Sequence, residues 1–157
     1  MAKNLALDLE GTLWVSLGTT LYPRPGLYGF LEFVYRSFDQ VGVYTLLSEV
    51  RAKGAVQVLV DQGFAPPVFL ERFLYICGPG GVKDLNYFPD TCLEETWILD
   101  DSPQVIPLTQ RDRWVQIASF EPKERCQSAF GSIDPQPLDQ ELARVQKRLA
   151  QICGLAD

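Results

Sequence analysis

The sequence predicts an α/β fold: one three-layer domain with a mostly parallel central sheet and no large cap domain. Short β-rich apolar runs alternate along the chain with segments of helical periodicity. Strands that alternate with helices pair in parallel through crossover connections. A length of 157 residues suits one domain with its own hydrophobic core. We therefore expect residues 1–157 to form a single domain.

The first part of the chain predicts one strand and one helix. Residues 3–8 form an apolar run that is typical of a buried strand and ends in Asp8. Residues 11–26 are rich in Gly, Thr and Pro and predict a connector. Its aromatic residues would be either core lining or a flap that faces the substrate. Residues 27–38 carry apolar side chains in steps of three and four, the spacing of an amphipathic helix.

A second strand and helix follow. Residues 41–47 form a β-rich run, and we expect the strand to end near Thr45. Ser48 is a suitable N-cap for a helix over residues 49–62. Gly63 would end that helix. The chain between Thr45 and Lys83 is too short to contain a large cap domain.

The second half of the chain predicts three more strands and a closing helix. The strands are expected at residues 72–77, 96–100 and 114–120. Residues 138–155 place Leu138, Leu142, Val145, Leu149 and Ile152 on one stripe, and Gly154 would stop this helix.

Polar side chains stand where the predicted strands end. Asp8 ends the first strand, Thr45 the second, and Asp100 with Asp101 the fourth, whereas Lys83 lies in the loop after the third. The carboxyl ends of parallel strands form the binding edge of an open α/β sheet. We therefore expect these five residues to lie close together.

Glu10 adds a fourth carboxylate to this edge. Residues two apart in an extended segment face the same way, so Asp8 and Glu10 can point together toward Asp100 and Asp101. Crowded carboxylates repel one another, and a hard divalent cation such as Mg²⁺ relieves the repulsion. A metal ion and Lys83 would suit a phosphoryl dianion, and a carboxylate beside them can attack it.

Composition excludes several other chemistries. The chain contains no histidine, which removes Ser-His and Cys-His nucleophile pairs and histidine metal sites. The formal net charge of −6 argues against a nucleic-acid partner, since phosphate backbones bind clustered Lys and Arg. No apolar run approaches the roughly 20 residues that cross a membrane, and the N-terminus does not resemble a signal peptide. We expect a cytoplasmic protein whose four cysteines are reduced.

These motifs together resemble the haloacid-dehalogenase-like superfamily, whose phosphatase domain is Rossmann-like and Mg²⁺-dependent. Its D-x-D-x-T motif is matched by Asp8, Glu10 and Thr12, its hydroxyl motif by Thr45, its lysine by Lys83, and its acidic motif by Asp100 and Asp101. The chain is most similar to the small C-terminal-domain phosphatases, also called NLI-interacting-factor-like. That likeness rests on Arg24-Pro25-Gly26, Lys83-Asp84-Leu85 and Leu99-Asp100-Asp101-Ser102-Pro103.

The resemblance implies a role for each site residue. Asp8 would be the nucleophile and a metal ligand. Glu10 would be the general acid/base and would give the metal its backbone carbonyl. Thr45 and Lys83 would bind the phosphoryl oxygens, and Asp100 with Asp101 would complete the Mg²⁺ site.

The function implied is a Mg²⁺-dependent phosphomonoesterase that acts on a phosphorylated protein or a small phosphate ester. Two features of the sequence leave alternatives open. Glu10 stands where the superfamily usually has Asp, which is compatible with a weak enzyme or a scaffold that has kept the fold. The loop from Cys77 to Lys83 is similar to a cysteine-phosphatase loop, but it has Lys where that loop has Arg. The sequence does not indicate an oligomeric state.

Overall fold

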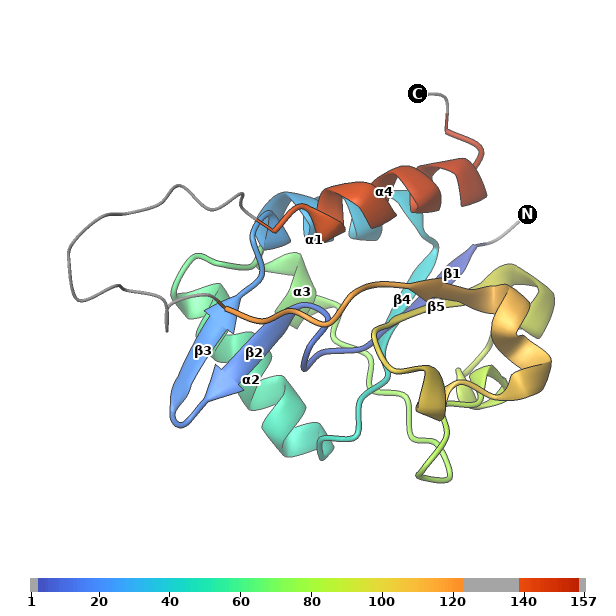
Figure 1. Ribbon diagram of the computed structural model, residues 1–157, viewed down its shortest axis with the longest axis horizontal. Coiled ribbons are helices and arrows are strands. Elements are labelled where there is room, and N and C mark those ends of the chain that lie inside the picture. The colour runs from blue at the N-terminus through green and yellow to red at the C-terminus, as the bar shows by residue number, and fades with distance from the viewer. Residues whose placement is uncertain (1–2, 123–138, 156–157) are drawn as a thin grey trace.

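A four-stranded parallel sheet forms the centre of the molecule (Figure 1). The computed structural model describes residues 3–122 and 139–155. The strand order is β4-β1-β5-β6, so β1 is paired on both sides. The strands of this sheet are β1 (Asn4–Leu7), β4 (Gln40–Val43), β5 (Thr96–Asp100) and β6 (Trp114–Gln116). This sheet and its flanking helices confirm the predicted single, compact α/β domain.

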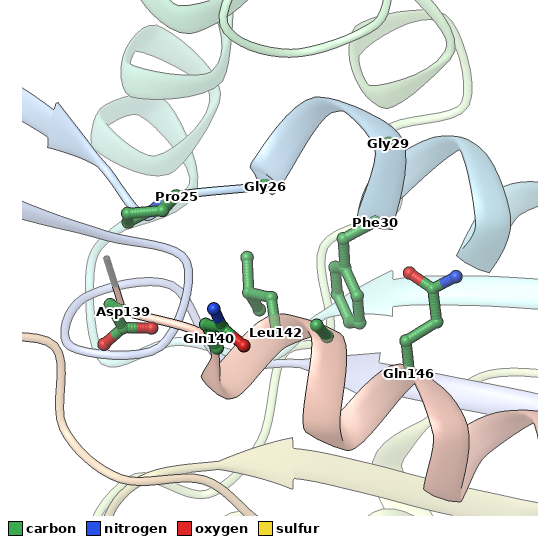
Figure 2. A pocket seen from close by; sticks show the side chains of 9 residues that line it. Pro25, Gly26, Gly29, Phe30, Asp139, Gln140, Leu142 and Gln146 are labelled. Atoms are coloured by element: carbon green, nitrogen blue, oxygen red, sulfur yellow. The ribbon is translucent and has the colours of Figure 1, made fainter. Parts of the chain in front are cut away.

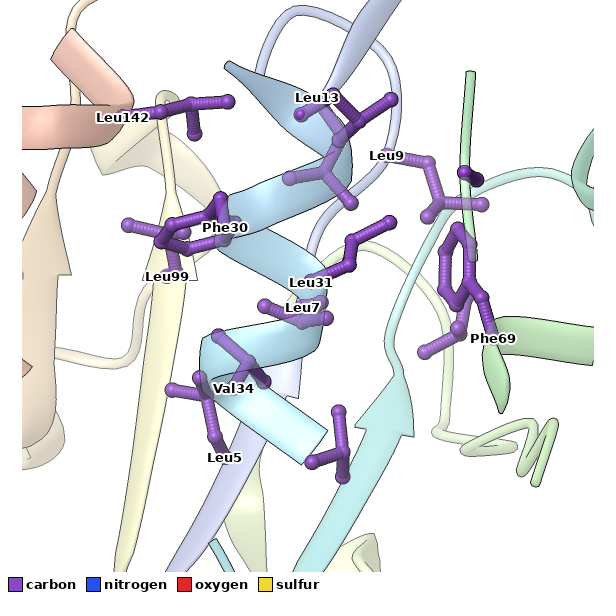
Figure 3. Packing of buried hydrophobic residues seen from close by; sticks show 14 of the residues in the cluster. Leu5, Leu7, Leu9, Leu13, Phe30, Leu31, Val34, Phe69, Leu99 and Leu142 are labelled. Atoms are coloured by element: carbon purple, nitrogen blue, oxygen red, sulfur yellow. The ribbon is translucent and has the colours of Figure 1, made fainter. Parts of the chain in front are cut away.

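The larger hydrophobic core lies between one face of the sheet and the α-helices. Leu5 and Leu7 of β1 point into this core, whereas Ala6 points to the other face. Figure 3 shows these leucines packed against Phe30 and Val34. The helices are α1 (Leu27–Ser37), α2 (Glu49–Asp61), α3 (Val68–Glu71) and α4 (Glu141–Ile152). None of the helices in the described part of the chain has the length and apolarity to cross a membrane.

Short 3₁₀ helices cover the other face of the sheet. A second cluster joins Ala6 and Ile98 of the sheet to Leu85, Phe88 and Ile106. The 3₁₀ helices are η1 (Leu85–Tyr87), η2 (Leu93–Glu95), η3 (Pro103–Val105) and η4 (Leu108–Arg113). The loop that carries Lys83 is therefore fixed next to the sheet by the core of this layer.

The predicted helices agree with the structure. Ser48 caps α2, because its hydroxyl accepts a hydrogen bond from the Arg51 amide at 3.4 Å. α4 buries Leu142, Val145 and Leu149, and Gly154 follows it with a φ of +69°. Leu138, which the sequence places on the same stripe, lies outside the described residues.

The strand predicted over residues 72–77 is wrong in extent. This segment forms only one bridge, between Tyr75 and Val43, with hydrogen bonds from the Val43 amide to the Leu74 carbonyl at 2.7 Å and from the Ile76 amide to the Val43 carbonyl at 2.9 Å. The chain then enters a Gly-Pro-Gly-Gly loop, where proline has no amide donor and Gly80 has a positive φ. The pairing therefore stops after these two bonds.

The predicted connector contains a β-hairpin that the sequence did not indicate. β2 (Trp14–Leu17) and β3 (Thr20–Pro23) pair in antiparallel fashion. Gly18, with a φ of +61°, permits the tight turn between them. Trp14 is fully buried, whereas Leu17 is exposed. The connector is thus core lining at its base and exposed toward its tip.

Candidate active site

Three carboxylates meet at the carboxyl ends of the two central strands. Asp8 directly follows β1, Asp100 is the last residue of β5, and Asp101 comes next. Each residue contributes one carboxylate oxygen to a group of three oxygens that all lie within 4.8 Å of one another. Asp8 and Asp100 are buried, and Asp101 is partly exposed. Because β1 and β5 are hydrogen-bonded neighbours, the sheet itself brings these residues together.

Lys83 enters this cluster from the loop before η1. Its Nζ donates to Asp8 Oδ1 at 2.7 Å and to Asp100 Oδ2 at 2.5 Å. Its backbone amide donates to the Val105 carbonyl at 2.7 Å, which fixes the loop. The lysine side chain is buried. An ammonium group has three hydrogens, so these two bonds leave one for another acceptor.

Two hydroxyl groups orient the carboxylates. Thr12 Oγ1 lies 2.8 Å from Asp8 Oδ2 and 3.3 Å from Asp101 Oδ1. A hydroxyl donates one hydrogen, and the shorter distance assigns it to Asp8. Ser119 Oγ donates to Asp101 Oδ2 at 2.6 Å. These two hydroxyl groups therefore orient the carboxylates of Asp8 and Asp101.

Gly11 permits the close approach of the Asp101 carboxylate. A Cβ at this position would lie 2.5 Å from Asp101 Oδ2, and the φ of Gly11 is +80°. Both the contact and the backbone conformation disfavour a side chain at this position. A substitution at Gly11 would strain the backbone and displace the Asp101 carboxylate.

The electrostatics of the cluster favour a bound cation. Burial raises the pKa of Asp8 to about 7; the nearby Asp100 also raises it, whereas Lys83 acts in the opposite direction. Burial likewise raises the pKa of Asp100. Burial alone would lower the pKa of Lys83, but the two carboxylates outweigh it and hold that pKa above its ordinary value. One ammonium faces three acidic groups, and their oxygen donors are the type that hard divalent cations take.

Glu10 faces the hairpin instead of the three carboxylates. Its Oε1 accepts hydrogen bonds from Trp14 Nε1 at 3.1 Å and from Ser16 Oγ, and its Oε2 accepts one from the Ser16 amide at 3.1 Å. The carboxylate is therefore attached to β2. The structure groups Asp8, Asp100 and Asp101 as possible ligands and gives the Glu10 side chain a separate set of partners.

Thr45 is the second residue after β4, at the point where the pairing of β4 with β1 ends. The Tyr44 amide donates to the Leu7 carbonyl at 2.8 Å, which carries the β4–β1 ladder up to Asp8 and Thr45. Thr45 Oγ1 accepts a hydrogen bond from the Leu47 amide at 3.2 Å. The hydroxyl hydrogen remains able to donate to a ligand. Thr45 is buried at the same edge as the carboxylates.

A cavity of about 470 Å³ opens beside Glu10. The hairpin forms one wall, and α2 with the loop before it forms the other. The lining combines apolar side chains with a few polar ones and one arginine. Its residues are Glu10, Ser16, Thr19, Leu21, Leu47, Arg51, Gly54, Ala55 and Val58.

Two site residues were missed by the sequence analysis. Ser119 lies in the segment after β6, so the rule that selected residues at strand ends could have identified it. Ser16 gave no such signal, because the hairpin that brings it to Glu10 was itself not predicted.

In the loop from Cys77 to Lys83, the lysine side chain is directed to the carboxylate cluster and not to the cysteine. The ammonium of Lys83 is bonded to Asp8 and Asp100, and Cys77 is exposed. Cys92 and Cys153 are also free thiols, and Cys126 lies outside the described residues. The loop therefore positions Lys83 in the carboxylate cluster.

Comparison with known proteins agrees with this geometry. No curated protein matches the chain. The family described as NLI interacting factor-like phosphatase matches residues 3–154, which include every residue of the carboxylate cluster. Phosphatases of this kind are hydrolases that act on a phosphorylated substrate, and the buried acidic triad fits a metal site. The chain therefore belongs to the NLI interacting factor-like phosphatase family.

Proposed function

We propose that the protein is a Mg²⁺-dependent phosphomonoesterase that works through a phospho-Asp8 intermediate. The observation that carries this proposal is the placement of the Asp8 carboxylate. One oxygen is bonded to Lys83 and the other to Thr12, in a buried cluster with Asp100 and Asp101. The carboxylates of Asp8, Asp100 and Asp101 would hold Mg²⁺, which would neutralise negative charge on the phosphoryl group.

The reaction would proceed in two displacements at phosphorus. An Asp8 oxygen forms a bond to phosphorus while the bond to the leaving oxygen breaks, and Glu10 supplies the proton to that oxygen. Water then attacks phosphorus and gives its proton to Glu10, which frees phosphate and restores Asp8. Lys83, through its third hydrogen, and the Thr45 hydroxyl would bind the phosphoryl oxygens, where electrostatic stabilisation supplies most of the rate.

Ser16 suits a carboxyl group that changes its protonation state. The Ser16 hydroxyl donates to Glu10 in the structure. A hydroxyl can also accept, so it can keep this contact when Glu10 carries the proton. Trp14 Nε1 and the Ser16 amide can only donate, and they bind the carboxyl oxygens of Glu10. The hairpin can thus support Glu10 in both steps.

Removal of divalent metal is expected to reduce phosphatase activity to the level of an Asp8→Asn variant. Without a cation, the negative charge that remains on the carboxylates repels the phosphate dianion. The measurement is hydrolysis of p-nitrophenyl phosphate with excess chelator, followed by addition of Mg²⁺. Recovery on adding Mg²⁺ distinguishes a metal requirement from denaturation.

Cys77→Ser is the control for the cysteine loop. This variant is expected to retain wild-type activity with Mg²⁺. Full activity in chelator, together with an inactive Cys77→Ser variant, would move the chemistry to the cysteine. Absence of turnover under every condition would instead favour the scaffold alternative, whose motivation is the Glu10 side chain bonded to the hairpin.

The cavity beside Glu10 would receive the leaving group, since the residue that protonates the leaving oxygen lines it. Gly54 faces open space, because a Cβ there would meet no atom within 4 Å. Gly54→Leu is therefore expected to place a side chain in the cavity and raise KM for phosphopeptides about tenfold, the size of one poorly fitted apolar contact. KM for a small phosphate ester should stay unchanged.

Gly54→Ala is the matched control for this variant. Both substitutions increase helix propensity in α2 by about 1 kcal/mol, but alanine leaves most of the cavity open. Steady-state kinetics on the two substrate classes separate the effects. Equal KM values for wild type and Gly54→Leu on all substrates would place the leaving group elsewhere.

A further inference from the structure

Arg24 is a buried cation next to residues 9–13, the loop that follows Asp8 and is called the catalytic loop below. Its side chain is 1% exposed, and its guanidinium forms a two-pronged ion pair with Asp139, with Nε–Oδ1 and Nη2–Oδ2 distances of 3.0 Å. Figure 2 shows Asp139 at the start of α4, near Pro25, the residue after Arg24. The ion pair therefore connects the end of the hairpin with the beginning of the C-terminal helix.

The same guanidinium binds three backbone carbonyls. Nη1 donates to the carbonyls of Thr12 at 3.1 Å and Gly11 at 3.4 Å, and Nη2 donates to the Ala118 carbonyl at 2.7 Å. The guanidinium also lies over the Phe120 ring, 5.5 Å from its centre. One side chain thus joins the catalytic loop, the segment after β6 and the start of α4.

Each of these carbonyls adjoins a residue that orients a carboxylate. Thr12 itself carries the hydroxyl bonded to Asp8. Ala118 directly precedes Ser119, whose hydroxyl is bonded to Asp101. The two segments are also joined directly, since the Phe120 amide donates to the Gly11 carbonyl at 2.8 Å. The position of Arg24 therefore affects both hydroxyl groups of the site.

Asp139 determines how the guanidinium is oriented. A buried guanidinium requires a compensating anion, and a carboxylate bound through two parallel hydrogen bonds fixes the plane of the group. That plane directs the remaining N–H donors at the Thr12, Gly11 and Ala118 carbonyls. Loss of the carboxylate charge would leave the cation uncompensated and weaken its hold on these carbonyls.

We propose that Arg24 is a positioning residue for the metal site and that its ion pair with Asp139 makes α4 part of that site. This inference rests on the proposed function, because the groups that Arg24 orients are the Mg²⁺ carboxylates. It assigns α4 a role in metal affinity in addition to its packing against the sheet.

Asp139→Asn tests the proposal. The amide is isosteric but cannot accept both hydrogen bonds of the guanidinium or balance its charge. We expect Mg²⁺ affinity, measured by titration calorimetry without substrate, to fall about tenfold, the lower end of the effect of outer-shell partners. We also expect kcat to fall and KM for p-nitrophenyl phosphate to change little.

Leu149→Ala is the control on α4, the helix that follows Asp139. Leu149 is buried in the second half of α4, and no described contact joins it to Arg24, Asp139 or Glu141. This variant is expected to lower the melting temperature without changing Mg²⁺ affinity. If a general loosening of α4 weakened the site, Mg²⁺ affinity would fall in both variants. If the ion pair positions the site, Mg²⁺ affinity should fall only in Asp139→Asn.

Arg24→Lys provides a second test, because lysine keeps the charge but lacks the planar fork. We expect the same loss of Mg²⁺ affinity as in Asp139→Asn. Wild-type Mg²⁺ affinity in both Asp139→Asn and Arg24→Lys, or an equal loss in Leu149→Ala, would overturn the proposal while leaving the proposed function intact. A wild-type protein that binds no Mg²⁺ would overturn both.

Discussion

Replacement of Asp8 by Asn is expected to reduce phosphatase turnover by about 10⁴-fold or more, the size of effect seen when a nucleophile is removed. An amide does not attack phosphorus and is a weak metal ligand. The fold should be retained, since Asn is isosteric and its oxygen can still accept from Lys83. Moreover, burial disfavours the charge on Asp8 and raises its pKa to about 7, so a neutral side chain suits this buried position.

Initial rates with p-nitrophenyl phosphate and Mg²⁺ measure the effect, and thermal melting reports the fold. Asp61→Asn is the matched control, because Asp61 is exposed at the end of α2 and accepts its hydrogen bond from Gln57. Beryllium fluoride gives a second readout: with Mg²⁺ it should raise the melting temperature of wild type but not of Asp8→Asn. Wild-type turnover in Asp8→Asn would exclude the phospho-Asp8 mechanism.

The central sheet was predictable because its signals are local. The apolar run before Asp8 and the run that ends in Asp100 each read as a strand without reference to the rest of the chain. Strand ends then located the carboxylates, since parallel neighbours finish at one edge. That geometric rule explains why Asp8 and Asp100, 92 positions apart in the printed sequence, were expected together.

The hairpin and the third strand were not predictable in the same way. β2 and β3 are half exposed and alternate only weakly, and their pairing depends on the turn at Gly18. The segment around Tyr75 has strand-like composition, but its pairing is decided by how soon the glycine-rich loop turns away. In both cases tertiary contacts override local propensity.

The direction of the Glu10 side chain illustrates a further limit. Alternation along an extended segment predicted that the side chains of Asp8 and Glu10 point together toward Asp100 and Asp101, but the Glu10 carboxylate turns to the hairpin instead. The position of the Glu10 carboxylate depends on Trp14 and Ser16, which bind it only because the hairpin folds back. The catalytic and binding roles of all the site residues, the metal identity and the cytoplasmic location stay predictions.

Removal of the Glu10 carboxyl as Glu10→Gln is expected to lower the rate on alkyl phosphates by about 10²–10⁴-fold, the usual contribution of a general acid or base. The carbonyl oxygen of glutamine can keep the contacts to Trp14 Nε1 and to the Ser16 hydroxyl, and only the bond from the Ser16 amide is lost, so the loss of rate reports proton transfer more than packing. The loss should be smaller with p-nitrophenyl phosphate, whose leaving group departs without a proton. Parallel kinetics with phosphoserine and p-nitrophenyl phosphate give this comparison.

Glu10→Asp separates tolerance of the longer side chain from dependence on it. An aspartate is one methylene shorter and would have to give up its bonds to Trp14 Nε1 and to Ser16, which the glutamate reaches in the structure. We therefore expect Glu10→Asp to lose activity on alkyl phosphates, and Ser16→Ala to lose less. Activity of Glu10→Asp equal to or above wild type would show that the hairpin contacts are incidental. A Glu10→Gln variant that hydrolyses alkyl phosphates at the wild-type rate would contradict the acid/base role itself, and the proton would then have to come from a group other than Glu10.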